Sequence, residues 1–103
     1  MLTAEEQNAL DEFRSIQDSH WQIGKVYLIR TVTMIDTGIL VKVTDKELVL
    51  ENAAWIADTG RFHEALKKAV FNEVEPFPDG QVIVGRGAII DAVVISNYQR
   101  EVK

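Results

Sequence analysis

The sequence predicts a mainly β protein with some α-helix: a small closed β-barrel with an N-terminal helix and one inserted short helix. Two observations predict this fold. From residue 25 onward, short runs of β-branched and aromatic residues follow one another at the close spacing typical of small barrels. Gly38, Gly85 and Gly87 lie inside or beside these runs, where a small barrel needs sharp bends.

Residues 3 to about 18 are predicted to form the N-terminal helix. Thr3 and Glu6 have the spacing of a capping box, in which each side chain accepts a hydrogen bond from the other residue's backbone. The helix also carries a narrow apolar stripe, formed by Leu10, Phe13 and Ile16. The stripe suits packing on the protein's own barrel or contact with a second protomer.

Three strands are expected next, over residues 26–34, 39–43 and 48–50. Asp36-Thr37-Gly38 has the composition of a turn between the first two strands. The polar segment Thr44–Glu47 predicts an antiparallel hairpin between the second and third. Residues 52–56 either prolong the third strand or leave it.

The inserted helix is predicted near residues 60–70, with Asp58 as its cap. Its apolar residues recur at helical spacing: Phe62, Ala65, Leu66, Ala69 and Val70. Pro76 and Pro78 then predict an extended segment and a turn.

The final part of the chain carries two runs, residues 82–84 and 88–95, that are apolar enough to be buried strands. Gly85-Arg86-Gly87 interrupts them, and the polar residues 97–103 are expected to be frayed. No repeat or linker divides the chain, which predicts a single domain over residues 1–103. In that domain the N-terminal helix takes residues 1–20 and the barrel takes residues 24–96.

Composition narrows the function classes. The chain has no cysteine, which excludes a thiol nucleophile, an iron–sulfur cluster and a disulfide framework. Eleven Lys and Arg face sixteen Asp and Glu, for a net charge of −5. Long nucleic acids are bound by many cations and are therefore disfavoured, whereas one or two arginines suffice for a small anion. No apolar run could span a bilayer and no signal peptide is evident, so we expect a cytoplasmic protein without a membrane partner.

Two blocks resemble the Sm-like family of small barrels. Gly38 to Leu50 resembles the family's first motif, a Gly-x-Leu strand that runs to an Asp-bearing turn, here at Asp45. Val84 to Ile90 resembles the second motif, an Arg-Gly pair before a β-branched strand. The resemblance implies an Sm-like or SH3-like barrel in which Arg86, Gly87 and Asp45 line a ligand pocket. It also implies a homo-oligomer, because such barrels commonly assemble edge to edge.

A further resemblance is to a family of small phage-encoded proteins. It is carried by Asn52 to Phe62, by Asn72 to Phe77 and by Val82 to Ala92, and it covers most of residues 21–95. This resemblance implies a phage or prophage setting, with a host-cell cytoplasmic location. This resemblance does not imply any catalytic or ligand-binding activity.

Nothing in the sequence favours catalysis. His20 and His63 are far apart, and neither has a partner at a metal-site or triad spacing. Asp58 is better interpreted as a helix cap than as a general base, and Gly85-Arg86-Gly87 lacks the helix of a phosphate-binding loop. We therefore expect a protein that is not an enzyme and has neither a metal nor a cofactor.

Ligand binding has better candidates. Arg86 lies between glycines that leave its guanidinium unshielded, although the glycines also suit a simple barrel bend. Trp55 stacks on a base if it is exposed and otherwise belongs to the core. Arg61 lies at a helix start. Arg30, isolated in an apolar strand, is either a pocket arginine or, by default, one half of an interior ion pair.

These features give one leading function and two alternatives. The leading hypothesis is a non-catalytic module that binds a small anion such as a cyclic or ADP-ribose-type nucleotide, and in a phage sequesters a host immune signalling nucleotide. The first alternative is a structural or assembly protein of the phage particle. The second is an Sm-like RNA-binding ring, which the net charge places last.

Overall fold

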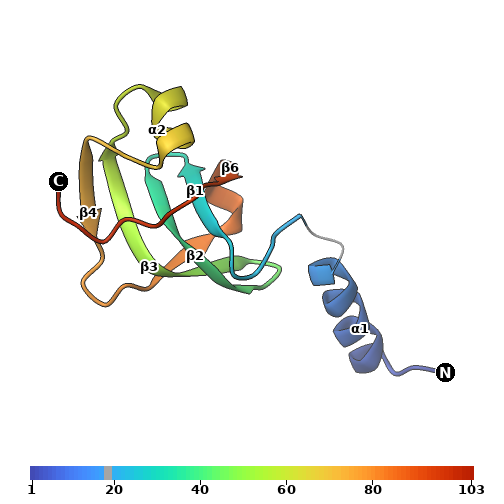
Figure 1. Cartoon of the computed structure of the whole chain (residues 1–103). Helices are drawn as coiled ribbons and strands as arrows, with labels where there is room; N and C mark the ends of the chain where they lie inside the picture. Colours follow the sequence, from blue (N-terminus) through green and yellow to red (C-terminus); the bar gives the residue numbers. More distant parts are fainter. Residues whose placement is uncertain (18–19) are drawn as a thin grey trace.

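The computed structural model describes residues 1–17 and 20–103, without the side chains of residues 11–17. In the described chain, six antiparallel strands form one sheet, accompanied by two α-helices (Figure 1). In order, the elements are α1 (Ala4–Gln17), β1 (Val26–Thr31), β2 (Ile35–Val43), β3 (Glu47–Asp58), α2 (Phe62–Lys68), β4 (Glu73–Pro76), β5 (Val82–Gly85), the 3-10 helix η1 (Arg86–Ala88) and β6 (Ile89–Val94). Within the same residues, no helix is both long enough and apolar enough to cross a membrane.

The sheet is organised around the long strand β3. Its strand order is β4-β3-β2-β1-β6, and β5 pairs with β3 as well. The first residues of β3, Glu47–Leu50, pair with β5, and its last residues, Ala54–Asp58, pair with β4. Asn52 lies between the two halves with a positive φ of 50°, which changes the course of the strand. β3 thereby pairs with both β5 and β4 along one edge, while β2 pairs with its other edge.

The capping box of α1 is confirmed. The Glu6 backbone donates to Thr3 Oγ1 over 3.1 Å, and the Thr3 backbone donates to Glu6 Oε1 over 3.3 Å. Figure 1 shows α1 extending away from the sheet. The Phe13 and Ile16 side chains of the predicted stripe lie outside the described residues, as do Asp18 and Ser19 at the expected helix end.

The turn predicted at Asp36-Thr37-Gly38 is wrong, because these residues lie inside β2 and are buried. The chain turns earlier, where the Thr31 backbone donates to the Met34 carbonyl over 2.8 Å. The glycine serves close packing instead: a Cβ at Gly38 would lie 2.8 Å from Leu50 Cβ on β3. A turn-like composition here reflects a close approach of two strands.

The second hairpin is confirmed. The Thr44 backbone donates to the Glu47 carbonyl over 2.9 Å, and Thr44 Oγ1 accepts a hydrogen bond from the Glu47 backbone over 2.9 Å. The sequence left open whether residues 52–56 continue the third strand. They do, since β3 runs to Asp58.

Helix α2 is present where its apolar periodicity predicted it, but Asp58 does not cap it. The N-cap residue is Arg61, which makes no side-chain capping bond. Asp58 Oδ1 instead accepts the Gly60 backbone N–H over 2.8 Å. Gly60 has a φ of 70°, so this bond fixes a left-handed turn that separates Asp58 from the helix.

Core residues occupy both faces of the sheet. On β1, Tyr27 and Ile29 belong to one cluster and Leu28 between them to the other, because successive strand residues point to opposite faces. The cluster of Leu28 also contains Ala65 of α2. The other cluster is completed by β2, β3 and β5 residues: Leu40, Val43, Leu48, Leu50, Ala53 and Val84.

Two predictions for the end of the chain are wrong. The strand at residues 88–95 was expected to be buried, yet β6 pairs with β1 alone and Ile90 is 64% exposed. Apolar composition does not distinguish an uncovered edge strand from a central one.

The C-terminal residues are anchored rather than frayed. Gln99 Nε2 donates to the Ala69 carbonyl over 2.7 Å, and Arg100 donates to the Ala53 carbonyl over 2.8 Å. Lys103 exchanges two backbone hydrogen bonds of 3.0 Å with Val74 of β4. The polar composition of this segment therefore did not indicate fraying, because its polar side chains donate hydrogen bonds to main-chain carbonyls.

Candidate functional site

The predicted ligand residues fall into three separate places. Arg86 and Gly87 lie in η1, where Arg86 contacts the β2–β3 turn that contains Asp45. Arg30 lies beside α2, and Arg61 is the residue directly before that helix. Trp55 lies on β3 and points to the sheet face opposite α2, because its neighbours Ala54 and Ile56 pack in the cluster that includes α2. The six residues therefore do not form one pocket.

Arg86 is held against the β2–β3 turn. Its Nη1 donates to the Thr44 carbonyl over 2.6 Å, and its backbone N–H donates to the Lys46 carbonyl over 2.9 Å. These two carbonyls flank Asp45, so η1 contacts the turn on both sides of that residue. The Arg86 side chain is half-buried and fixed in direction.

The glycines that flank Arg86 leave open space. A Cβ added at Gly85 or Gly87 would meet no atom within 4 Å, and neither residue has a positive φ. Their backbone conformation therefore does not require glycine. The missing side chains instead leave the surroundings of Arg86 accessible to a ligand.

Arg86 also differs from a typical surface arginine in its charge environment. In the described part of the chain, no carboxylate lies within ion-pair distance of its guanidinium. Its positive charge is held by a neutral carbonyl alone. Such a guanidinium keeps hydrogen-bond donors and a full charge for an anion.

The ion pair expected for Arg30 is present, but it lies on the surface instead of in the interior. Arg30 Nε donates to Asp91 Oδ1 over 2.7 Å, and Nη2 makes a second bond to Oδ2 of the same carboxylate. Both side chains are close to half exposed. The hydrogen bonds from Arg30 hold the pKa of the Asp91 carboxyl below its ordinary value, and attraction between the charges acts in the same direction.

The same guanidinium lies over an aromatic ring of α2. Arg30 Cζ is 5.0 Å from the centre of the Phe62 ring, within the range of a cation–π contact. Arg30 thus contacts a carboxylate and a ring at once, and its charge is compensated within the protein. Arg61, the next residue back along the chain from Phe62, is exposed.

Trp55 is 37% exposed, which resolves the choice between core and surface in favour of a partly exposed ring. Its cross-strand neighbours are Asp36 on β2 and Glu75 on β4. Asp36 is only 7% exposed, and burial raises the pKa of its carboxyl above the ordinary value. In the described chain, this carboxyl has no side-chain cation beside it.

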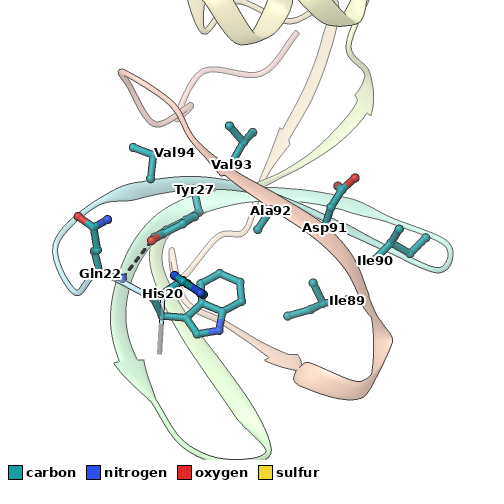
Figure 2. Close-up of a pocket in the computed structure, with 10 residues that line it drawn as sticks. His20, Gln22, Tyr27, Ile89, Ile90, Asp91, Ala92, Val93 and Val94 are labelled. Atoms are coloured by element: carbon teal, nitrogen blue, oxygen red, sulfur yellow. Dashed lines mark hydrogen bonds between the residues drawn. The ribbon is translucent and has the colours of Figure 1, made fainter. Parts of the chain in front are cut away.

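One hollow of the described chain was not predicted from the sequence. It has a volume of about 510 Å³ and lies between residues 20–22 and the last strand (Figure 2). The lining residues are His20, Trp21, Gln22, Tyr27 and all six residues of β6. A tryptophan just before the first strand, and an aromatic residue within that strand, were the available signals.

The aromatic wall of this hollow is ordered by two contacts. Tyr27 Oη accepts the Gln22 backbone N–H over 3.0 Å. The Trp21 ring meets the Tyr27 ring edge to face, with 5.2 Å between centroids. The opposite wall is the strand β6, whose side chains are mostly apolar.

The positions of the titratable side chains can also be compared with those of a metal site. Within the described residues, no group of three or more His, Asp or Glu side chains is placed to hold a metal ion. The arrangement can bind an anion at Arg86 and an apolar or extended group along β6.

Comparisons with protein families, curated proteins and solved structures found no match to this chain.

Proposed function

We propose that this protein is a non-catalytic binding module built on a small Sm-like or SH3-like β-barrel. The pairing pattern supports a barrel: β5 and β6 are consecutive through η1, yet β5 pairs with β3 and β6 pairs with β1. A chain that joins two strands on opposite sides of a curved sheet tends to close it. The order of the two sequence blocks supports the Sm-like type.

The ligand that we propose is a small phosphorylated anion such as a nucleotide, bound by Arg86 and Gly87. The observation that carries this proposal is the guanidinium of Arg86, which is held in place by the Thr44 carbonyl and has no carboxylate beside it in the described chain. Open space at Gly85 and Gly87 lets a ligand reach it. A planar guanidinium of this kind binds phosphate oxygens through paired hydrogen bonds.

The resemblance to small phage-encoded proteins supports a biological role for such binding. A protein without catalytic groups that holds a nucleotide removes it from solution. We propose that the nucleotide is a host immune signal, sequestered in the cytoplasm of the host cell. The acidic net charge of −5 fits a small ligand better than a long polyanion.

Calorimetric titration with a panel of cyclic and ADP-ribose-type nucleotides tests the proposal. We expect heat with at least one of them, and a loss of affinity of about tenfold or more in Arg86→Ala, the equivalent of about 1.4 kcal/mol. Arg86→Lys keeps the charge but not the planar fork, so we expect an intermediate affinity. Thermal unfolding of each variant confirms that it is folded.

No heat with any nucleotide contradicts the ligand class. Unchanged affinity in folded Arg86→Ala contradicts the assigned site.

The uncovered strand β6 favours a second candidate, a structural or assembly protein of the phage particle. Ile90 and Val94 are exposed along this strand, as in surfaces that contact other proteins. This candidate predicts a fixed number of copies in purified virions, measurable by quantitative mass spectrometry. Absence from virions contradicts it.

A further inference from the structure

Three side chains of neighbouring strands form one row across the sheet: Asp36 of β2, Trp55 of β3 and Glu75 of β4. Asp36 is opposite Trp55 in the β2–β3 register, and Trp55 is opposite Glu75 in the β3–β4 register. The three strands lie side by side (Figure 1). Residues directly opposite each other in antiparallel strands point to the same face of a sheet. The Trp55 ring therefore lies between two carboxylates on one face.

The carboxylate of Asp36 has no partner in the described chain. Asp36 is 7% exposed, and no described residue forms a hydrogen bond or an ion pair with its carboxyl group. Its other cross-strand neighbour is Ile29 of β1, an apolar core residue. Burial raises the pKa of this carboxyl, because the charged form is deprived of water. A buried carboxylate is costly unless a cation compensates it, so this position favours a positively charged ligand.

The Trp55 ring offers a second contact for such a ligand. Trp55 is 37% exposed, while its chain neighbours Ala54 and Ile56 are buried on the opposite face of the sheet. The face of an indole ring attracts a cation within about 6 Å of the ring centre. A cation between Trp55 and Asp36 is therefore attracted by the ring and by the carboxylate at once.

The local charge of the three strands is strongly negative. β2, β3 and β4 together contain six Asp or Glu residues and one cation, Lys42, which lies toward the other end of β2 from Asp36. Arg100 approaches the bend of β3, but its guanidinium donates to two main-chain carbonyls. No ion pair of the described chain joins Arg100 to Glu75. The negative charge of the row is therefore still available to a ligand.

We propose that this row binds a small organic dication that carries one ammonium group at each end of an alkyl chain. The first ammonium lies between the Trp55 ring and Asp36, the methylene groups cover the ring, and the second ammonium pairs with Glu75. Neighbouring strands are about 4.8 Å apart, so β2 and β4 are separated by roughly 10 Å. The exposed Glu75 side chain is longer than that of Asp36, which reduces this separation to the length of a short diamine.

This site is distinct from the proposed nucleotide site. Arg86 lies in η1 and contacts the β2–β3 turn, and it takes no part in the row. The carboxylates beside Trp55 repel a phosphorylated ligand, so the two sites favour ligands of opposite charge. The inference therefore stands or fails independently of the nucleotide proposal.

A titration with 1,4-diaminobutane tests the site. The chain has two tryptophans, so nuclear magnetic resonance of the indole N–H groups reports on Trp55 and uses Trp21 as an internal control. Trp55→Phe identifies the Trp55 signal. At low salt we expect the Trp55 signal to shift to saturation and the Trp21 signal to stay in place. n-Butylamine has the same chain with one ammonium, and it should bind about tenfold or more weakly, because it leaves one carboxylate unpaired.

Three substitutions separate the roles of the carboxylates. Asp36→Asn keeps the size of the side chain but removes its charge, and it should weaken diamine binding by about tenfold or more. Glu75→Gln should lower the affinity for the diamine to that for n-butylamine. Asp91→Asn is the matched control, because it removes a carboxylate that Arg30 already binds, and it should leave the affinity unchanged. Thermal unfolding verifies that each variant is folded.

Several outcomes overturn the proposal. One is a Trp55 signal that does not move with 1,4-diaminobutane, and another is a shift of Trp21 alone. Equal affinities for the diamine and for n-butylamine contradict the use of two carboxylates. Equal losses in Asp36→Asn and Asp91→Asn would show that net charge alone attracts the amine.

Discussion

The two arginines Arg30 and Arg86 differ in whether a carboxylate of the protein compensates their charge. Beside α2, Arg30 and Asp91 compensate each other through two hydrogen bonds, and the Phe62 ring covers one side of the guanidinium. At the β2–β3 turn, Arg86 is held by a neutral carbonyl with no described carboxylate beside it. The hydrogen-bond donors and the charge of Arg30 are already used by a carboxylate of the protein. The guanidinium of Arg86 is fixed in direction, and its charge is still available to an anionic ligand.

The carboxylates show the same contrast. Asp91 is exposed and bonded to Arg30, and its pKa is lowered. Asp36 is almost completely buried beside Trp55 without a described cation, and its pKa is raised. Position in the sheet, and not residue type, decides which charges are stabilised.

The largest effect on stability is expected from Arg86→Ala. This substitution removes a charged donor from the Thr44 carbonyl and should lower the free energy of unfolding by about 1.5–3 kcal/mol. Urea unfolding at neutral pH measures the change. Arg61→Ala is the matched control, because Arg61 is exposed and makes no capping bond, and its unfolding midpoint should not change. An equal loss in the two variants would contradict a holding role for the Thr44 bond.

A smaller effect of opposite sign is expected from Asp36→Asn. The raised pKa means that the folded state prefers the protonated carboxyl, so ionised Asp36 destabilises the protein near neutral pH. The neutral amide should therefore raise the free energy of unfolding at pH 7 by about 1 kcal/mol.

The pH profile checks the sign of this effect. In the natural protein, the stability contributed by protonated Asp36 is present below its unfolded pKa of about 3.9 and is lost as pH rises through its raised folded pKa. Asp36→Asn should lack that loss. A variant that is less stable at pH 7 and keeps the same profile would contradict the role given to this carboxyl.

The smallest effect is expected from Asp91→Asn, because both partners of this ion pair are exposed to solvent that screens them. Its sign with pH is the reverse of that for Asp36. The pKa of Asp91 is lowered, so its contribution is present above about pH 3.9 and is lost as pH falls through the lowered value. Urea unfolding at pH 7 and pH 3 measures the difference. A larger loss at pH 3 than at pH 7 would contradict this assignment.

The sequence was a good guide wherever structure depends on neighbouring residues. The capping box of Thr3 and Glu6 and the Thr44–Glu47 hairpin are held by hydrogen bonds from backbone N–H groups to side chains three residues away, and both were predicted. Helix α2 followed from the spacing of its apolar residues. Features of this kind depend on local geometry, which the order of residues determines.

Features that depend on distant strands were missed. Gly38 was assigned to a turn because its contact with Leu50 of β3 is visible only in the folded sheet. β6 has the composition of a central strand but lies at an edge. The anchoring of Arg100 depends on main-chain carbonyls, which every residue carries and which no side-chain pattern reveals.

The candidate site was predicted in part. Arg86 and Arg30 were both singled out, but their different surroundings were not visible, since the partners lie 42 residues away at Thr44 and 61 residues away at Asp91. The hollow along β6 was missed, because it needs residues 20–22 and the last strand to meet in space. The residue type alone made both arginines candidates for ligand binding. Only the folded structure shows that one of them is paired with a carboxylate, whereas the other has none beside it in the described chain.

The most direct test of the central claim compares the two arginines in one titration. The same nucleotide is titrated into the natural protein, Arg86→Ala and Arg30→Ala, with folding verified for each. We predict that affinity falls about tenfold or more in Arg86→Ala and stays unchanged in Arg30→Ala, whose guanidinium is already bound to Asp91. Equal losses in the two variants, or a loss in Arg30→Ala alone, would contradict the account.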